Sequence, residues 1–151
     1  MSGMTGRELR WFHDHSLCLD ILGLNYYPEM SAYDLRHEDG RERLQPVWGG
    51  VSRLKALVRE YWRQYWRPIF LTETSTNGKV ADRVAWLQDS IAAVWELRSE
   101  GIPVIGYTWW PLYDLINWDY REGTRPVQDY IEPMGLWELR LDEKGELKRL
   151  P

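Results

Sequence analysis

The sequence predicts an α/β protein whose strands run parallel to one another. Three short, mostly apolar runs alternate with two stretches in which apolar residues recur at helical spacing. Alternation of strand and helix is typical of parallel βα units. The runs carry few polar residues on either side, as strands do when a parallel sheet is covered on both faces. We therefore expect a small open sheet, or a section of a larger one.

The three predicted strands are the apolar runs at residues 19–27, 68–73 and 103–110. The first run is closed by Pro28, which a central strand does not accommodate. Each run is short enough for a strand and is bounded by proline or by turn residues. Near the end of the chain, residues 134–141 and 147–150 flank a turn, and we expect them to form a hairpin.

Two amphipathic helices are predicted between the strands. The first begins at Val51 and ends before Pro68, because proline disfavours helix at the residue before it. The second begins at Asp82, a good capping residue, and ends before Gly101. Its predicted apolar stripe consists of Val84, Leu87, Ile91, Val94 and Trp95. We interpret the helical tryptophans as structural: Trp62, Trp66, Trp86 and Trp95.

The remaining segments are predicted to be irregular. Residues 31–50 carry many charges together with glycines and a proline, which favours a surface loop. The His13-Asp14-His15 run lacks a further cluster of ligands, so we interpret it as an exposed N-terminal segment. The three histidines and the single cysteine, Cys18, leave little material for a zinc site and exclude an intramolecular disulfide. We expect no metal and no cofactor.

Charge and length exclude several classes of protein. The 19 basic and 23 acidic residues give a formal charge of −4, which argues against a nucleic-acid-binding role. No apolar run approaches the roughly 20 residues of a membrane span, and the start lacks a secretory signal, so a cytoplasmic protein is the default. The 151 residues suit one domain but are too few for a complete eight-fold α/β barrel of about 250 residues.

Aromatic composition and the ends of the strands point to a site. The chain has ten Trp and nine Tyr but only two Phe, and flat rings with polar handles suit sugar ligands. Asn25 and Tyr27 end the first run, Glu73 ends the second, and Trp110 ends the third. Parallel strands gather their carboxyl ends at one edge, where α/β proteins place their sites. Glu73 follows an apolar run, where a carboxylate is costly unless it is hydrogen-bonded or used.

Three segments resemble glycoside hydrolase family 1, the β-glucosidase group. Residues 20–27 resemble its sixth barrel strand, residues 68–78 its seventh, and residues 106–118 its eighth with the following loop. The motifs occur in the family's order and cover about residues 19–137. The resemblance implies strands six to eight of a (β/α)8 TIM barrel, followed by the short C-terminal hairpin, with residues 1–151 as a single partial catalytic domain.

The resemblance also implies residue roles. Glu73 matches the nucleophile of a retaining glycosidase, which forms a covalent glycosyl-enzyme. Tyr27 matches the tyrosine that hydrogen-bonds to this carboxylate, and Asn25 a polar residue beside it. Trp110 matches the platform under the sugar, and Trp118 a residue that lines the same subsite.

The sequence departs from the family pattern at several positions. Asn117 stands where β-glucosidases have a glutamate that grips sugar hydroxyls, and it keeps donor and acceptor but loses the charge. The family's general acid/base lies in an Asn-Glu motif, and no Asn-Glu pair occurs in this sequence. The local carboxylates near the strand ends are Glu29, Asp114 and Asp119.

The expected activity is therefore hydrolysis of a β-linked glycoside by an assembled barrel, with a carbohydrate substrate and a segment or partner chain supplying the other strands. Two alternatives stay open. The chain is a non-catalytic fragment or sugar-binding remnant without the general acid/base, or it is a half-barrel subunit that needs a partner chain. In either case we expect neither a nucleic acid nor a membrane as partner.

Overall fold

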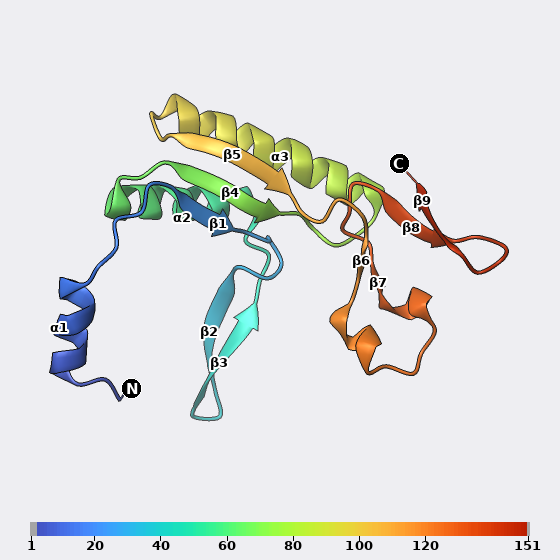
Figure 1. The fold of residues 1–151 in the computed structure, drawn as a ribbon, viewed down its shortest axis with the longest axis horizontal. Helices are drawn as coiled ribbons and strands as arrows, with labels where there is room; N and C mark the ends of the chain where they lie inside the picture. The colour runs from blue at the N-terminus through green and yellow to red at the C-terminus, as the bar shows by residue number, and fades with distance from the viewer. Residues whose placement is uncertain (1–2, 151) are drawn as a thin grey trace.

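The computed structural model describes residues 3–150 and has an α/β architecture (Figure 1). Its centre is a parallel sheet of three strands in the order β1-β4-β5. The strands are β1 (Leu22–Asn25), β4 (Ile69–Thr74) and β5 (Val104–Trp109). The crossover helices α2 (Gly50–Tyr65) and α3 (Val80–Ser99) connect them. The predicted α/β class and the order of strands and helices are therefore confirmed, and β1 is shorter than the predicted run.

The register of the sheet decides which side chains meet at its carboxyl end. Leu24 is paired with Leu71, and after a shift of register Asn25 is paired with Glu73. Leu71 is paired with Tyr107 on the other side. Because all three strands are parallel, the residues that follow β1, β4 and β5 emerge at one edge of the sheet.

The core lies between the sheet and the two helices. It comprises Leu24, Tyr26, Leu54, Val58, Ile69, Leu71, Trp86, Ala93, Leu97, Ile102 and Val104. Leu54 and Val58 are the buried residues of α2, one helical turn apart. Arg59 of α2 and Glu100 after α3 form two hydrogen bonds of 2.8 and 2.6 Å, so the helices are also linked at the surface.

The apolar stripe predicted for α3 is wrong about which face of the helix is buried. Val84, Ile91 and Trp95 are exposed, while Leu87 and Val94 are partly buried and Val94 packs against the core. The buried residues of α3 are instead Arg83, Trp86, Ser90, Ala93 and Leu97.

The physical reason is that the polar residues on the buried face of α3 have partners. Trp86 Nε1 donates to Thr74 Oγ1 at 3.1 Å. The Ser90 and Tyr107 hydroxyls are hydrogen-bonded at 2.8 Å. A polar side chain can be buried at little cost when it is hydrogen-bonded, so hydropathy alone misplaces this face. The prediction that the helical tryptophans pack in the structure is confirmed for Trp86, which is buried, and for Trp62, which is partly buried against the core. Trp66 and Trp95 are instead exposed.

The segment predicted as a loop at residues 31–50 contains a hairpin. Strands β2 (Tyr33–Glu38) and β3 (Arg41–Pro46) pair antiparallel. Asp39 and Gly40 form the turn, with φ of 51° and 71°, and an Asp-Gly turn with positive φ is a favoured hairpin connection. Every residue of both strands is exposed. The sequence therefore does not sustain the alternation of apolar and polar residues that marks a half-buried strand.

The remaining segments lie outside the three-stranded sheet and its two crossover helices. Near the N-terminus, α1 (Gly6–Asp14) is a helix with a capping box between Thr5 and Glu8, where the sequence predicted only an exposed run. After β5 come β6 (Leu115–Ile116), the 3₁₀ helices η1 (Trp118–Arg121) and η2 (Val127–Tyr130), and β7 (Ile131–Glu132). The predicted C-terminal hairpin is confirmed as β8 (Glu138–Leu141) and β9 (Leu147–Leu150). The β2–β3 hairpin and the β6–β7 segment extend away from α3 (Figure 1).

The chain exposes more surface than its mass requires. Its accessible surface is 11196 Å², whereas a compact monomer of this mass exposes about 8,000 Å². The excess reflects the projecting segments and the sheet face opposite α2 and α3. Within residues 3–150, no helix is long and apolar enough to cross a membrane.

Candidate active site

Glu73 and Tyr27 form a hydrogen-bonded pair at the carboxyl end of the sheet. Tyr27 Oη donates to Glu73 Oε2 at 2.8 Å. Glu73 is part of β4, and its carbonyl accepts the backbone N–H of Tyr26 at 2.9 Å. This backbone bond continues the β1–β4 pairing beyond Asn25 and so places Tyr27 beside Glu73. The structure brings together the two residues that the sequence assigned to catalysis.

The electrostatic setting keeps Tyr27 a donor. Burial raises the pKa of Tyr27 well above its ordinary value, and the hydrogen bond to Glu73 and the charges of Glu73 and Glu29 raise it further. A tyrosine with a raised pKa keeps its proton at neutral pH. At neutral pH, Oε2 of Glu73 therefore faces a hydroxyl donor, which orients the carboxylate.

Asn25 lies next to this pair, on the sheet face opposite the helices. Its Oδ1 accepts the Thr72 hydroxyl at 2.7 Å. Gly23 leaves room for Thr72, because a Cβ at Gly23 would lie 3.1 Å from Thr72 Cγ2. The sequence reasoning missed Thr72. The alternation of side chains along β4 is the signal that places Thr72 on the opposite face from Leu71.

Trp110 completes this group from the third strand. Its backbone N–H donates to the Thr74 carbonyl at 3.1 Å, and the Trp110–Pro111 peptide bond is cis. The rings of Tyr27 and Trp110 are arranged edge to face, with centroids 6.5 Å apart. The Trp110 side chain is partly open to solvent, with 37% of the residue's surface exposed. An aromatic ring beside a carboxylate and an amide can stack against a sugar ring.

Asn117 and Trp118 lie on the segment between β6 and β7, and their contacts are local. The Asn117 amide donates to Glu132, and its Oδ1 accepts the backbone N–H of Asp119 at 2.8 Å, capping η1. Trp118 is 64% exposed, and the Arg121 guanidinium lies 4.6 Å from its ring centroid. Both hydrogen-bonding ends of the Asn117 side chain are thus occupied within this segment.

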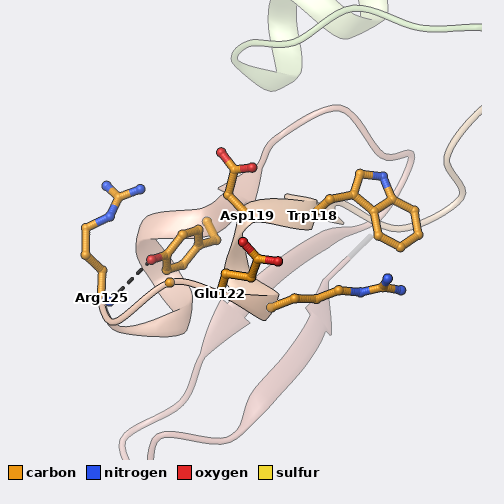
Figure 2. A pocket seen from close by; sticks show the side chains of 7 residues that line it. Trp118, Asp119, Glu122 and Arg125 are labelled. Atoms are coloured by element: carbon orange, nitrogen blue, oxygen red, sulfur yellow. Dashed lines mark hydrogen bonds between the residues drawn. The ribbon is translucent and has the colours of Figure 1, made fainter.

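An open pocket of about 450 Å³ lies beside Trp118 (Figure 2). It is lined by Trp118, Asp119, Arg121, Glu122, Gly123, Arg125 and Tyr130. The Arg125 backbone N–H donates to the Tyr130 hydroxyl at 3.3 Å, and the Arg125 guanidinium stacks on the Tyr130 ring. The pocket mixes charges of both signs with two aromatic rings, and it is built entirely from the β6–β7 segment.

The three local carboxylates considered beside Glu73 have different surroundings. Glu29 accepts hydrogen bonds from the loop after β4. Asp114 is buried, pairs with Arg83 and accepts two backbone N–H groups, so its role is structural. Asp119 belongs to η1 and lines the open pocket. Within residues 3–150, no group of three His, Cys, Asp or Glu residues is arranged to hold a metal ion.

Comparisons with known proteins identify similar sequences. No protein-family model matches the sequence. The chain is 31% identical over 83 residues to the 6-phospho-beta-glucosidase AscB of Escherichia coli, covering 46% of this chain and 18% of the relative. It is 30% identical over 123 residues to a 1,4-beta-D-glucan glucohydrolase of Thermotoga neapolitana, covering 66% and 28%. It is 27% identical over 123 residues to the galactolipid galactosyltransferase SFR2 of Arabidopsis thaliana, covering 74% and 19%.

Solved structures show the same fold. The β-glycosidase of Thermosphaera aggregans matches with a TM-score of 0.64 at 24% identity, over 87% of this chain and 29% of that chain. The β-glucosidase of Thermotoga maritima in complex with glucoimidazole matches with a TM-score of 0.66 at 19% identity, over 87% and 32%. The chain spans less than a third of the length of each of these relatives.

Proposed function

We propose that this chain, which is similar to family 1 β-glucosidases and related glycosidases over only part of their length, contributes the nucleophile half of a retaining β-glycosidase site. The reaction is hydrolysis of an O-glycosidic bond by a complete barrel. Glu73 attacks the anomeric carbon, the bond to the leaving group breaks, and a covalent glycosyl-enzyme forms. Water then releases the sugar.

The Tyr27–Glu73 hydrogen bond is the observation that carries this proposal. A nucleophilic carboxylate must be ionised, oriented and reachable from the substrate side. Tyr27 Oη donates to Glu73 Oε2 at 2.8 Å, which leaves Oε1 free of this donor. The pair lies at the carboxyl end of a parallel sheet, which is the face where α/β barrels carry out chemistry.

The neighbouring side chains suit a sugar next to Glu73. Trp110 presents an aromatic surface, and Asn25 presents an amide on the face opposite the helices. We assign these two residues to substrate binding. Asn117 and Trp118 complete the proposed set from the β6–β7 segment, where Asn117 needs to exchange its local bonds for bonds to sugar hydroxyls.

The second carboxylate of the reaction comes from outside this chain in the proposed assembly. Retaining glycosidases use two carboxyl groups about 5–5.5 Å apart. Glu29 accepts a hydrogen bond from the loop after β4, and Asp114 accepts one from Arg83. Asp119 belongs to η1 on the β6–β7 segment and not to the strand ends that carry Glu73. We therefore expect the general acid/base to be supplied with the other strands of the barrel, either by a longer form of this polypeptide or by a partner chain.

A mechanism-based label tests the proposal. An activated 2-fluoro-β-glucoside carries a leaving group that departs without protonation, so the test needs only the nucleophile half of the site. In the assembled barrel, we expect a mass increase of one fluorosugar on the peptide that contains Glu73, and loss of this increase in Glu73→Gln. Glu60→Gln, a change at an exposed carboxylate of α2, is the matched control. Labelling at another residue, or labelling that persists in Glu73→Gln, would falsify the assignment.

The competing interpretation is a non-catalytic sugar-binding chain. It predicts that a β-glucoside quenches or shifts the fluorescence of tryptophans such as Trp110 without any covalent label. Repeating the labelling experiment with a co-expressed segment that carries the first barrel strands distinguishes the catalytic chain from the non-catalytic one. Label that appears only in the assembly favours a half-barrel subunit, and binding without label in both samples favours the non-catalytic chain.

A further inference from the structure

The Glu29 side chain bridges two loops at the carboxyl end of the sheet. Glu29 follows β1, while its carboxylate reaches the loop between β4 and α3. Glu29 Oε1 accepts the backbone N–H of Asn77 at 2.8 Å, and Oε2 accepts the Thr76 hydroxyl at 3.4 Å. These contacts join positions 47 and 48 residues apart in sequence.

The loop that Glu29 binds is the direct continuation of Glu73. Thr74, Ser75 and Thr76 are all buried. The far end of the loop is held by the Gly78 N–H, which donates to the Pro133 carbonyl at 3.0 Å. Glu29 therefore provides the attachment on the β1 side, and the Gly78–Pro133 bond provides the attachment on the β7 side.

The turn that carries Glu29 also carries Tyr27. The Tyr27 carbonyl accepts the N–H groups of Met30 and Ser31 at 3.1 and 2.8 Å, and the Tyr27 N–H donates to the Ser31 hydroxyl at 2.9 Å. This closed turn makes residues 27–31 one unit. One end of that unit donates to Glu73, and its middle holds the loop that follows Glu73.

We propose that Glu29 is a positioning residue that fastens the loop after Glu73 to the turn that carries Tyr27. Its carboxylate acts as a hydrogen-bond acceptor and not as an acid. A bond from a backbone N–H to a charged acceptor is among the stronger hydrogen bonds in proteins. Without it, Tyr27 and Glu73 remain linked only through their own hydrogen bond and the β1–β4 backbone pairing.

The fastening itself can be tested without any catalytic assay. Amide hydrogen exchange of Asn77, followed by NMR on the full chain, is expected to be roughly tenfold faster or more in Glu29→Ala, because the amide loses a charged acceptor. Glu29→Gln keeps a neutral acceptor at the same reach and is expected to exchange at a rate between those of the original chain and Glu29→Ala. Glu29→Asp shortens the reach and is expected to lose most of the protection, so the result does not depend on one truncation.

The effect of Glu29 on the reactivity of Glu73 rests on the proposed function and is measured separately. In the assembled barrel, labelling of Glu73 by the 2-fluoro-glucoside is expected to slow in Glu29→Ala and to recover in part in Glu29→Gln, with little change in the concentration for half-maximal rate. Unchanged exchange of Asn77 in both Glu29→Ala and Glu29→Asp overturns the fastening. If exchange responds but the unmodified chain is never labelled, the proposed function fails and the fastening stands.

Discussion

The Tyr27 hydroxyl lies 2.8 Å from Glu73 Oε2, although the two residues are 46 positions apart in the chain. This proximity follows from the register of two parallel strands, in which Asn25 is paired with Glu73 and the Tyr26 N–H donates to the Glu73 carbonyl. A slip of one residue would turn Tyr27 to the other face of the sheet. The geometry of the candidate nucleophile is therefore a property of the β1–β4 pairing.

Tyr27→Phe is expected to slow covalent labelling of Glu73 by roughly 10- to 100-fold, the range set by the loss of a hydrogen bond to a charged group. Phenylalanine keeps the ring that lies edge to face with Trp110, so the packing of Trp110 is expected to stay in place. The measurement is the rate of fluorosugar incorporation in the assembled barrel by intact-protein mass spectrometry. Tyr33→Phe, on the exposed β2 strand, is the control. Equal rates for Tyr27→Phe and the control would show that the Tyr27 hydroxyl does not orient Glu73.

Alkaline pH is expected to destabilise the fold through its buried tyrosines. Burial raises the pKa of Tyr26 to about 12, against about 10 in the unfolded chain. Between these values the native state holds a proton that the unfolded state has lost, so the free energy of unfolding falls as pH rises. The pKa values of Tyr27 and Tyr107 are also raised, chiefly by burial, and act in the same direction.

Urea unfolding at pH 8 and at about pH 11 measures this effect. The loss of stability is expected to be smaller in Tyr26→Phe, even though that variant starts lower because the Gly50 carbonyl loses its hydroxyl donor. An identical pH dependence in Tyr26→Phe and the original chain would contradict the assignment to Tyr26.

Arg83→Met is expected to lower the free energy of unfolding by about 3–5 kcal/mol, because it leaves the buried Asp114 carboxylate without its cationic partner. Arg83 is 5% exposed and lies 3.1 Å from Asp114 and 3.0 Å from Glu138. Arg140 also pairs with Glu138 but is largely exposed, so Arg140→Met is expected to cost less than about 1 kcal/mol. Urea unfolding of the two variants provides the comparison, and similar losses would contradict it.

The strand-helix order was predictable because it depends on local periodicity and on proline and glycine positions. The buried face of α3 was not, because it depends on partners that only the folded sheet supplies. Trp86 and Ser90 face the sheet because they form hydrogen bonds with Thr74 and Tyr107. The β2–β3 hairpin escaped prediction for the opposite reason, since its residues are all exposed and the Asp39-Gly40 turn was its only signal.

The grouping of four side chains at one edge of the sheet was predictable because parallel strands bring their carboxyl ends together. These side chains are Asn25, Tyr27, Glu73 and Trp110. Asn117 and Trp118 follow the short β6 strand, and no periodic pattern relates that segment to the sheet. The part played by Glu29 also lay beyond the sequence, because a carboxylate after a strand looks the same whether it faces solvent or holds a neighbouring loop. The Asn77 N–H that it accepts is a backbone group and leaves no signature in the sequence.

Gly135→Ala is expected to destabilise the chain by about 1–3 kcal/mol or more, the cost of inserting atoms into packed structure. A Cβ at Gly135 would lie 2.3 Å from the backbone nitrogen of Asp114, and a backbone atom cannot move aside as a side chain can. Gly6→Ala in α1 meets nothing within 4 Å and is the control. Thermal or urea unfolding measures both, and equal stability of the two variants would contradict the close approach.

Two substitutions on different sides of α3, one buried and one exposed, test which face packs on the sheet. Leu97 is completely buried, so Leu97→Ala is expected to cost about 2–5 kcal/mol. Ile91 is 39% exposed, and Ile91→Glu is expected to change the free energy of unfolding by only about 0.5 kcal/mol.

The same Ile91→Glu change is expected to reduce self-association, since Ile91, Trp95 and Ile105 form an exposed apolar groove beside the unpaired edge of β5. Urea unfolding and sedimentation velocity measure the two effects separately. A large loss of stability in Ile91→Glu would mean that the apolar stripe faces the sheet after all, and unchanged association would mean that the groove does not drive contacts between chains.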